Sequence, residues 1–151
     1  MISTIRTNSE NPDFVALVKD LDSYLAEKDG NEHSFYDQFN KIDLIRHVVL
    51  ATIDGKAIGC GAIKEFSPGV MEVKRMYTLP EWRGKGVASR ILEELELWAY
   101  ETGADKCILE TGLRQAEAIR LYEKKHYEKI PNYGQYIGVE NSRCFEKNIR
   151  K

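Results

Sequence analysis

The segment from Met76 to Ala88 most constrains the fold, because it joins a strand-like apolar stretch, a basic glycine-rich turn and a long amphipathic helix. Gly84 and Gly86 allow the backbone to turn tightly and to approach a ligand closely. The helix that follows begins with unpaired N–H groups and the positive end of its dipole. Arg83 and Lys85 add two cationic side chains at the same place. Together these groups predict a binding site for the diphosphate of a small molecule.

The spacing of this turn fits neither of two common nucleotide-binding patterns. A Walker loop fails because position 79 is Leu and position 86 is Gly. A dinucleotide-binding fingerprint fails because position 89 is Ser and because residues 80–83 separate the strand from the first glycine. These failures disfavour a nucleotide-binding protein of another class. The pattern that remains is Arg-x-x-Gly-x-Ala from Arg83 to Ala88, and on these six residues alone an ordinary basic loop before a helix stays an alternative.

The bulk properties are those of one soluble globular domain of 151 residues, with 42% hydrophobic and 30% charged residues. The net charge of −2 and the absence of a basic cluster argue against a nucleic-acid partner. The sequence has no apolar run of membrane-spanning length and no signal-peptide layout at its start. We therefore expect a cytoplasmic protein with no membrane partner.

The cysteines and histidines offer no metal-binding pattern. Cys60, Cys107 and Cys144 are odd in number and widely spread, which is typical of reduced cysteines that fill a core. Neither Cys-x-x-Cys nor His-Glu-x-x-His occurs, so we expect no protein-held metal.

The apolar periodicity predicts an α/β domain with a mixed central β-sheet, antiparallel first and parallel at its centre. Strands at 47–53, 57–66 and 70–79 form a meander around the Asp54-Gly55 turn. A helix from Gly84 to about Thr102, closed by Gly103, then leads to a short buried strand at 106–110, and this crossover implies a parallel strand pair. The remaining predicted elements are a strand at 2–7, helices at 12–29, 31–40 and 117–125, and strands at 127–130 and 143–147.

Two motifs carry a family resemblance. The Arg83-to-Ala88 pattern resembles the acyl-coenzyme A loop of the GCN5-related N-acetyltransferase (GNAT) family, and Ala118 to Lys124 resembles that family's Ala-Ile-x-Leu-Tyr-Glu-Lys segment. From about residue 45 onward the predicted elements also follow the family's order. The resemblance implies a GNAT-like acyl-CoA N-acyltransferase fold, a mixed sheet flanked by helices, in a single domain over 1–151. Within it, 1–44 would be variable acceptor-side helices, 45–130 the acetyl-CoA-binding core, and 131–151 a C-terminal loop and strand.

The resemblance also implies how acetyl-CoA would bind as co-substrate. In the family, the strand before the loop splays from its parallel neighbour at a bulge, and the pantetheine arm pairs with the backbone groups left open. Here those groups would belong to Met76, Tyr77 and Thr78, and core packing is the plain alternative for the side chains of Met76 and Tyr77. The pyrophosphate would be held by the side chains or amides of Arg83, Gly84, Lys85, Gly86, Val87 and Ala88. Gln115 replaces a frequent family asparagine, and its longer amide would contact the pantetheine or the acceptor.

Two residues are candidates for catalysis. The resemblance places Tyr122 near the thioester sulfur, where a phenol gives a proton to the departing thiolate; without the motif, Tyr122 would be a packed helix tyrosine. Glu72 resembles the catalytic glutamate of the histone-acetylating branch and would take the proton of the amine, with Glu110 as a second choice. Alternation puts Glu72 on the face of Lys74 and Met76. An exposed strand glutamate, or a reaction without a dedicated base, is the alternative.

A histidine marks a departure from the family pattern. His126-Tyr127 replaces a Gly-Phe or Gly-Tyr pair, so His126 would tolerate a positive φ less well than glycine there. We expect a turn histidine at this position more than a catalytic base.

The acceptor side is predicted only in outline. Tyr24, Glu27, Asp29, His33, Phe35 and Tyr36 are candidates from the N-terminal helices. Residues 20–37 are rich in Asp and Glu, which either attract a cationic amine or form a solvated face. The polar, aromatic loop 132–136 either lines the acceptor pocket or crosses a homodimer interface.

The predicted function is therefore an N-acetyltransferase that moves an acetyl group from acetyl-CoA directly to a primary amine of a small molecule, amino acid or peptide. The alternative is a non-catalytic acyl-CoA-binding or sensing module, because the fold alone does not determine a substrate.

Overall fold

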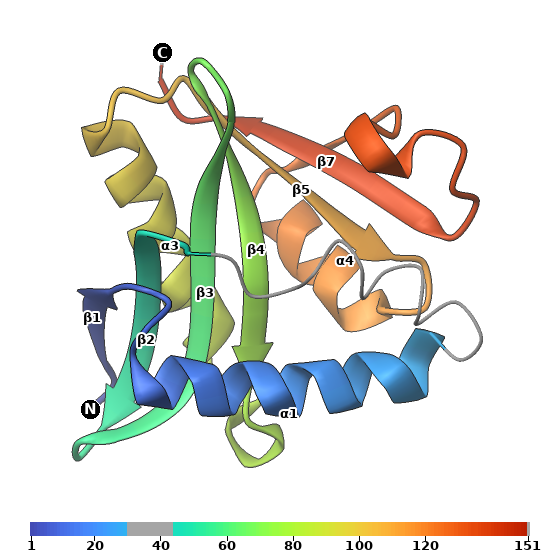
Figure 1. Cartoon of the computed structure of the whole chain (residues 1–151). Helices are drawn as coiled ribbons and strands as arrows, with labels where there is room; N and C mark the ends of the chain where they lie inside the picture. The colour runs from blue at the N-terminus through green and yellow to red at the C-terminus, as the bar shows by residue number, and fades with distance from the viewer. Residues whose placement is uncertain (30–43, 151) are drawn as a thin grey trace.

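A computed structural model describes residues 1–29 and 44–150, and its centre is a mixed β-sheet (Figure 1). The seven strands run in the order β1-β2-β3-β4-β5-β7-β6. The β4–β5 pair is parallel, and each of the other pairs in this order is antiparallel. The predicted mixed sheet is confirmed. The strands are β1 (Ser3–Thr7), β2 (His47–Ile53), β3 (Lys56–Ser67), β4 (Val70–Thr78), β5 (Lys106–Gly112), β6 (Glu128–Ile130) and β7 (Ser142–Asn148).

Helices cover both faces of this sheet. The long helix α1 (Pro12–Asp29) crosses the front of the strands in Figure 1, and α3 (Val87–Glu101) lies behind them. The shorter helix α4 (Ala116–Lys124) follows β5, and Tyr122 of α4 belongs to the same core as α3. Short 3₁₀ turns occur at Pro80–Trp82 and Gly134–Tyr136. The helix predicted at 31–40 lies outside the described residues.

The start of α1 follows from its sequence. The Asn11 side-chain oxygen accepts hydrogen bonds from the backbone N–H groups of Asp13 at 2.9 Å and Phe14 at 3.4 Å, so the predicted cap is confirmed. Pro12 occupies the first helical position, where a missing N–H costs nothing. The apolar stripe Phe14, Leu17, Val18 and Leu21 is buried against the sheet.

Strand β2 shows why the sheet needs a helix on each face. Val48 and Leu50 join the core beneath α1, whereas Val49 and Ala51 join the core beneath α3. Successive strand residues point to opposite faces, so a strand covered on both sides is apolar without interruption.

The predicted start of α3 at Gly84 is wrong. Gly84 and Gly86 have φ values of +75° and +82°, in the left-handed region, so the helix begins only at Val87. The other predicted boundaries agree with the structure to within about two residues.

A β-bulge divides β4. Cys60 on β3 pairs with Tyr77 and Ala62 pairs with Lys74, so Gly61 opposes two β4 residues, one of which is Arg75 at φ +61°. An extra residue reverses the alternation beyond it.

The bulge corrects the predicted face of Met76. Its Sδ lies on the α3 side, where a Cβ added at Gly61 would meet it at 2.5 Å. Glu72 and Lys74 lie on the opposite face from Met71 and Val73, which pack in the core beneath α3. The expectation that Met76 shares a face with Glu72 and Lys74 is therefore wrong.

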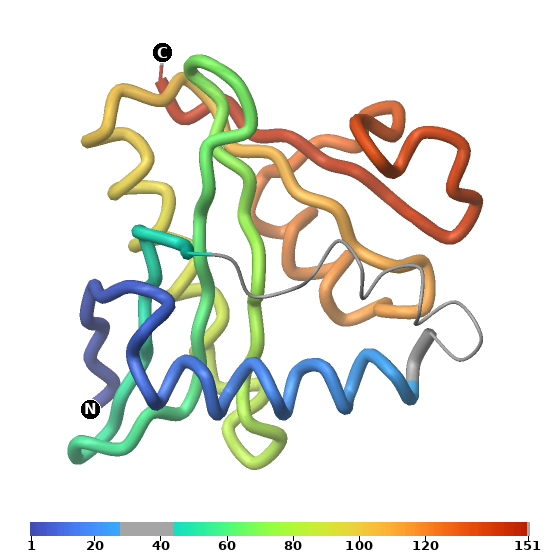
Figure 2. The backbone as a smooth tube through the Cα atoms, in the orientation of Figure 1, coloured from blue at the N-terminus to red at the C-terminus, as the bar shows by residue number. Residues whose placement is uncertain are grey.

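The parallel pair is short, and this opens the sheet. β4 and β5 pair only at Val70–Lys106, Met71–Cys107 and Glu72–Ile108. Beyond Glu72 the two strands separate, as their traces show in Figure 2. The backbone of β4 that faces this opening has no β5 partner in the ladder, as the predicted splay requires.

Within the described ranges, no helix combines the length and the apolar character that a membrane crossing requires.

Candidate active site

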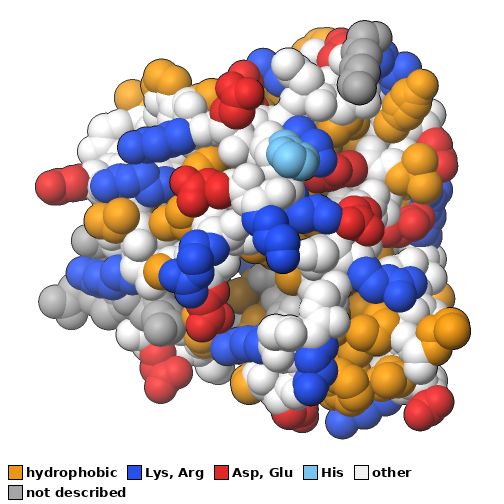
Figure 3. All heavy atoms as spheres, turned by 180° about the vertical axis from the view of Figure 1, so that it is seen from behind, with side chains coloured by type: hydrophobic (Ala, Val, Ile, Leu, Met, Phe, Trp, Pro, Cys, Tyr) orange, Lys and Arg blue, Asp and Glu red, His pale blue; other side chains and the backbone are white. Residues whose placement is uncertain are grey.

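A cavity of about 880 Å³ lies where β4 and β5 diverge. Its walls come from α1, from β4 and β5, from the loop and first turn of α3, and from α4. From behind, the surface is hollowed, and Lys and Arg side chains gather near the hollow (Figure 3). Arg83, Arg120 and Lys124 are among the cationic residues that line the cavity.

The glycine loop forms one end of the cavity. Four residues predicted to bind the cofactor, Gly84, Gly86, Val87 and Ala88, line it, and so does Ser89. Gly86 precedes the first helical residue, so α3 begins at this wall of the cavity. The first N–H groups of the helix lie there and have no acceptor within the helix. This arrangement suits an anionic group.

The two predicted cations of the loop differ in position. Lys85 is exposed, outside the lining of the cavity. Arg83 turns toward α1: its Nε donates a 3.0 Å hydrogen bond to the Thr78 carbonyl, and its guanidinium carbon lies 4.8 Å from the ring centre of Tyr24 and 5.5 Å from that of Tyr77. Arg83 therefore links the loop to α1, a contact between distant segments that the sequence did not reveal.

Met76, Tyr77 and Thr78 all line the cavity, as the predicted pantetheine strand should. Tyr77 is also a core residue beneath α1, so its side chain packs while its backbone borders the opening. Burial raises the pKa of the Tyr77 phenol, with Asp20 adding to the effect.

Tyr122 reaches the cavity from α4 and is only 6% exposed. Its ring makes an edge contact with Tyr127, at a centroid distance of 5.8 Å, and also lies near Phe145. Burial, and secondarily the negative charge of Glu110, raise the pKa of the Tyr122 phenol, so the hydroxyl keeps its proton at neutral and moderately alkaline pH. A neutral buried phenol can donate a proton or a hydrogen bond to a developing anion.

Glu72 is a buried carboxylate, 8% exposed, on the cavity wall. The Tyr133 hydroxyl donates a 2.6 Å hydrogen bond to Glu72 Oε2, and Lys74 Nζ lies 3.3 Å from Oε1. The alternative of an exposed strand glutamate is therefore wrong. The Glu72 side chain is therefore held in place by one hydroxyl and one ammonium group.

Further polar side chains line the cavity. Glu110 on β5 and Tyr136 line it, and burial, with Glu110 and then Glu72 adding to the effect, raises the pKa of the Tyr136 phenol. Gln115 also lines the cavity as the residue before α4, and its side chain makes no capping hydrogen bond. Through Tyr136, the 132–136 loop reaches this cavity.

The candidates on the N-terminal side are only partly placed. Tyr24 lines the cavity together with Leu21 and Leu25, whereas Glu27 is exposed and outside the lining. The described part of the chain does not include His33, Phe35, Tyr36 or the side chain of Asp29. His126 is exposed in a turn with φ +73°, so this position does take the positive φ for which the family uses glycine.

The described ranges contain no group of three or more His, Cys, Asp or Glu residues arranged to hold a metal ion. Cys60, Cys107 and Cys144 are buried free thiols that belong to the core, as predicted.

A mixed sheet opened between β4 and β5, with a glycine loop and a helix N-terminus at one end of the opening, defines the acyl-CoA N-acyltransferase class of fold. The model of the "Acetyltransferase (GNAT) family" matches residues 11–127, and the chain belongs to this family.

Individual relatives agree with this assignment. The chain is 34% identical over 126 residues to a protein named "IAA acetyltransferase" from Azospirillum brasilense, covering 81% of each chain. A structure described as an acyl-CoA N-acyltransferase from Klebsiella pneumoniae superposes with a TM-score of 0.83, at 27% identity, over 99% of this chain and 98% of that one. A GNAT family acetyltransferase from Elizabethkingia anophelis, solved with acetyl-CoA bound, shares the fold at 15% identity with a TM-score of 0.69, over 97% of both chains.

Proposed function

We propose that the protein transfers an acetyl group from acetyl-CoA directly to the primary amine of a small molecule, an amino acid or a peptide. The observation that carries this proposal is the continuity of one cavity, which joins the glycine loop before α3 to the opening where Glu72 and Tyr122 lie. Family membership supports acetyl transfer, and the acetyl-CoA bound to the Elizabethkingia relative supports the choice of co-substrate.

The residues present fit this co-substrate. The left-handed Gly86 and the first amides of α3 would take the pyrophosphate. The open β4 edge at Met76, Tyr77 and Thr78 would pair with the pantetheine amides as an added strand does. Gln115 would supply a further amide beside the same arm.

The catalytic side chains then have separate tasks. A primary alkylamine is protonated at neutral pH, so Glu72 takes its proton before the nitrogen attacks the thioester carbonyl. The backbone N–H of Met76 polarises that carbonyl and stabilises the tetrahedral oxyanion. As the carbon–sulfur bond breaks, Tyr122 donates its proton to the thiolate of coenzyme A, and its phenolate takes back the second proton that the nitrogen loses as the amide forms. Most of the acceleration comes from holding the amine and the thioester in line.

A non-catalytic acyl-CoA-binding module is the second candidate, and the burial of Glu72 and Tyr122 at the cavity argues against it. A binding module needs the glycine loop but not a carboxylate and a neutral phenol at the strand opening.

The test combines binding and turnover. Calorimetry with acetyl-CoA and with free coenzyme A measures binding, and release of free thiol measures transfer to a panel of primary amines, amino acids and short peptides. We expect binding of both forms and acceptor-dependent thiol release. Tight binding without turnover on any acceptor would favour the module, and absence of binding would reject both candidates.

A further inference from the structure

The two oxygens of the Glu72 carboxylate have different neighbours. Oε2 accepts the Tyr133 hydroxyl at 2.6 Å, a short and therefore strong bond to an ionised group. Oε1 faces the ammonium of Lys74 at 3.3 Å, a longer contact. One oxygen is thus anchored by a neutral donor, and the other already meets an alkylammonium group.

The anchoring residue sits in a well-packed loop. The Tyr133 ring makes edge contacts with Phe66 at 5.1 Å and with Tyr136 at 5.9 Å between ring centroids. The Asn132 side chain donates to the Val139 carbonyl at 3.0 Å, and the Tyr136 N–H donates to the Tyr133 carbonyl at 2.9 Å. These contacts restrict the rotamer of Tyr133 and so fix where its hydroxyl points.

The hydroxyl remains a donor over the whole working range of pH. Burial raises the pKa of the Tyr133 phenol well above its ordinary value, and the negative charge of Glu72 raises it further. The bond therefore runs from phenol to carboxylate. It occupies Oε2 and leaves Oε1, which lies beside the Lys74 ammonium, without a contact from the phenol.

Tyr133 lies beyond residue 127, where the match to the family model ends. The loop between β6 and β7 therefore contributes Tyr133, a residue outside the family match, to a contact with Glu72 on β4.

We propose that Tyr133 is the positioning residue for Glu72: its hydroxyl anchors Oε2 so that Oε1 accepts the proton of the acceptor amine. This inference rests on the proposed function, in which Glu72 is the base. Tyr133 itself touches neither the acceptor nor the coenzyme.

The test is a double-mutant cycle on turnover with Tyr133→Phe and Glu72→Gln. Tyr133→Phe keeps the packed ring and removes only the anchoring bond, so we expect kcat to fall about tenfold with the KM for acetyl-CoA unchanged. Glu72→Gln should lower kcat about a hundredfold. The double variant should match Glu72→Gln within about twofold, because Tyr133 acts only through that carboxylate.

Tyr127→Phe is the matched control. Tyr127 also donates to a partly buried glutamate, Glu96, at 2.9 Å, but neither residue lines the cavity. This variant should lower the melting temperature and leave kcat within about twofold of wild type.

The outcomes separate the inference from the proposed function. If Tyr133→Phe keeps the wild-type kcat while Glu72→Gln is impaired, the positioning role alone is rejected. The same conclusion follows if adding Tyr133→Phe to Glu72→Gln lowers kcat by the same factor as Tyr133→Phe does in wild type. Wild-type kcat in Glu72→Gln rejects Glu72 as the base. A chain that turns over no amine rejects both.

Discussion

At the scale of single residues, the two candidate catalytic side chains have different surroundings in the cavity. Tyr122 sits among rings and near a negative charge, which favours its neutral form. Glu72 accepts a hydrogen bond from the Tyr133 hydroxyl and lies 3.3 Å from the Lys74 ammonium.

Replacing Tyr122 tests the acid. Tyr122→Phe keeps the ring contacts but removes the proton donor, so we expect kcat to fall at least about tenfold while the affinity for acetyl-CoA stays unchanged. Steady-state thiol release and calorimetry measure the two quantities. Unchanged turnover would remove Tyr122 from the mechanism, and a parallel loss of binding would indicate a structural effect.

The pH profile tests the same phenol without a mutation. Because the pKa of Tyr122 is raised, its hydroxyl stays protonated above the ordinary tyrosine value of about 10. We expect no loss of kcat between pH 7 and about 9.5 from its ionisation. A fall in kcat centred inside this range, with the fold intact by circular dichroism, would contradict this assignment.

At the scale of elements, the cavity depends on how three segments meet: the bulge in β4, the turn before α3 and the packing of α3 on the sheet. The β4–β5 ladder stops at Glu72, just before the bulge at Arg75 and Met76, and the turn places the start of α3 at the cavity in the gap between the strands. Gly61 lets α3 approach, because an added Cβ would lie 2.8 Å from Ile91 and 2.9 Å from Leu95.

Gly86→Ala tests the turn. Its φ of +82° strains any L side chain, although a Cβ there would meet no atom within 4 Å. We expect a loss of about 1–2 kcal/mol in the free energy of unfolding and at least about a tenfold rise in the Kd for acetyl-CoA. Gly103→Ala is the control, since Gly103 has φ +97° and equal space at the other end of α3. It should lose similar stability and bind normally; equal weakening of binding would contradict a role for the turn.

Gly61→Ala tests the packing of α3. The added methyl group must displace Met76, Ile91 or Leu95, and overpacking of this kind costs about 1–3 kcal/mol. Denaturant unfolding measures the loss. A variant as stable as wild type would show that α3 shifts freely on the sheet.

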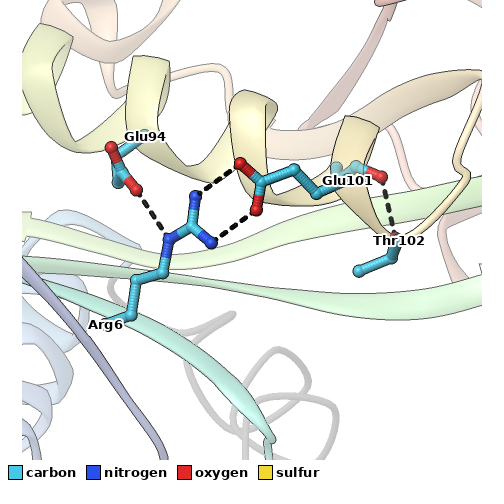
Figure 4. Close-up of polar contacts among 5 residues, drawn as sticks. Arg6, Glu94, Glu101 and Thr102 are labelled. Carbon is cyan, nitrogen blue, oxygen red and sulfur yellow. Dashed lines mark hydrogen bonds and ion pairs between the residues drawn. The ribbon is translucent and has the colours of Figure 1, made fainter.

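At the scale of the whole molecule, the first strand is tied to the helix behind the sheet. Arg6 on β1 lies 2.6 Å from a carboxylate oxygen of Glu94 and 2.6 Å from one of Glu101, both on α3 (Figure 4). Its guanidinium also lies over the ring of Trp98, 4.8 Å from the centroid. This cluster joins β1, at one edge of the sheet, to the same helix that begins at the cavity.

Arg6→Ala should lower the melting temperature at pH 7 by about 1–3 °C, since partly exposed ion pairs contribute little. The Arg6 hydrogen bond lowers the pKa of Glu101 below its ordinary 4.5. The ion pair between Arg6 and Glu101 therefore stabilises the fold above about pH 4.5. This stabilisation is lost as the pH falls through the lower pKa that Glu101 has in the folded protein. The difference in melting temperature between wild type and variant should shrink below pH 4. A difference that persists there would assign the effect to the contact with Trp98.

Much of the fold could be predicted because it depends on local geometry. The alternation in β2, the cap at Asn11 and the glycines before α3 each reflect a requirement that one or a few neighbouring residues meet. The predicted start of α3 and the predicted face of Met76 were wrong. Left-handed glycines and a β-bulge interrupt the regular alternation of the backbone without changing the amino-acid composition of the segment.

The sequence by itself determined the order of the elements and the glycine turn before α3, because periodicity and turn residues record local backbone needs, and its resemblance to the family made Glu72 and Tyr122 candidates. Only the tertiary structure decided that Tyr133 meets Glu72 across 61 positions and that Arg83 turns to Tyr24. Such contacts depend on how the bulged sheet and its helices pack together. No local sequence pattern shows which residues far apart in the chain will meet.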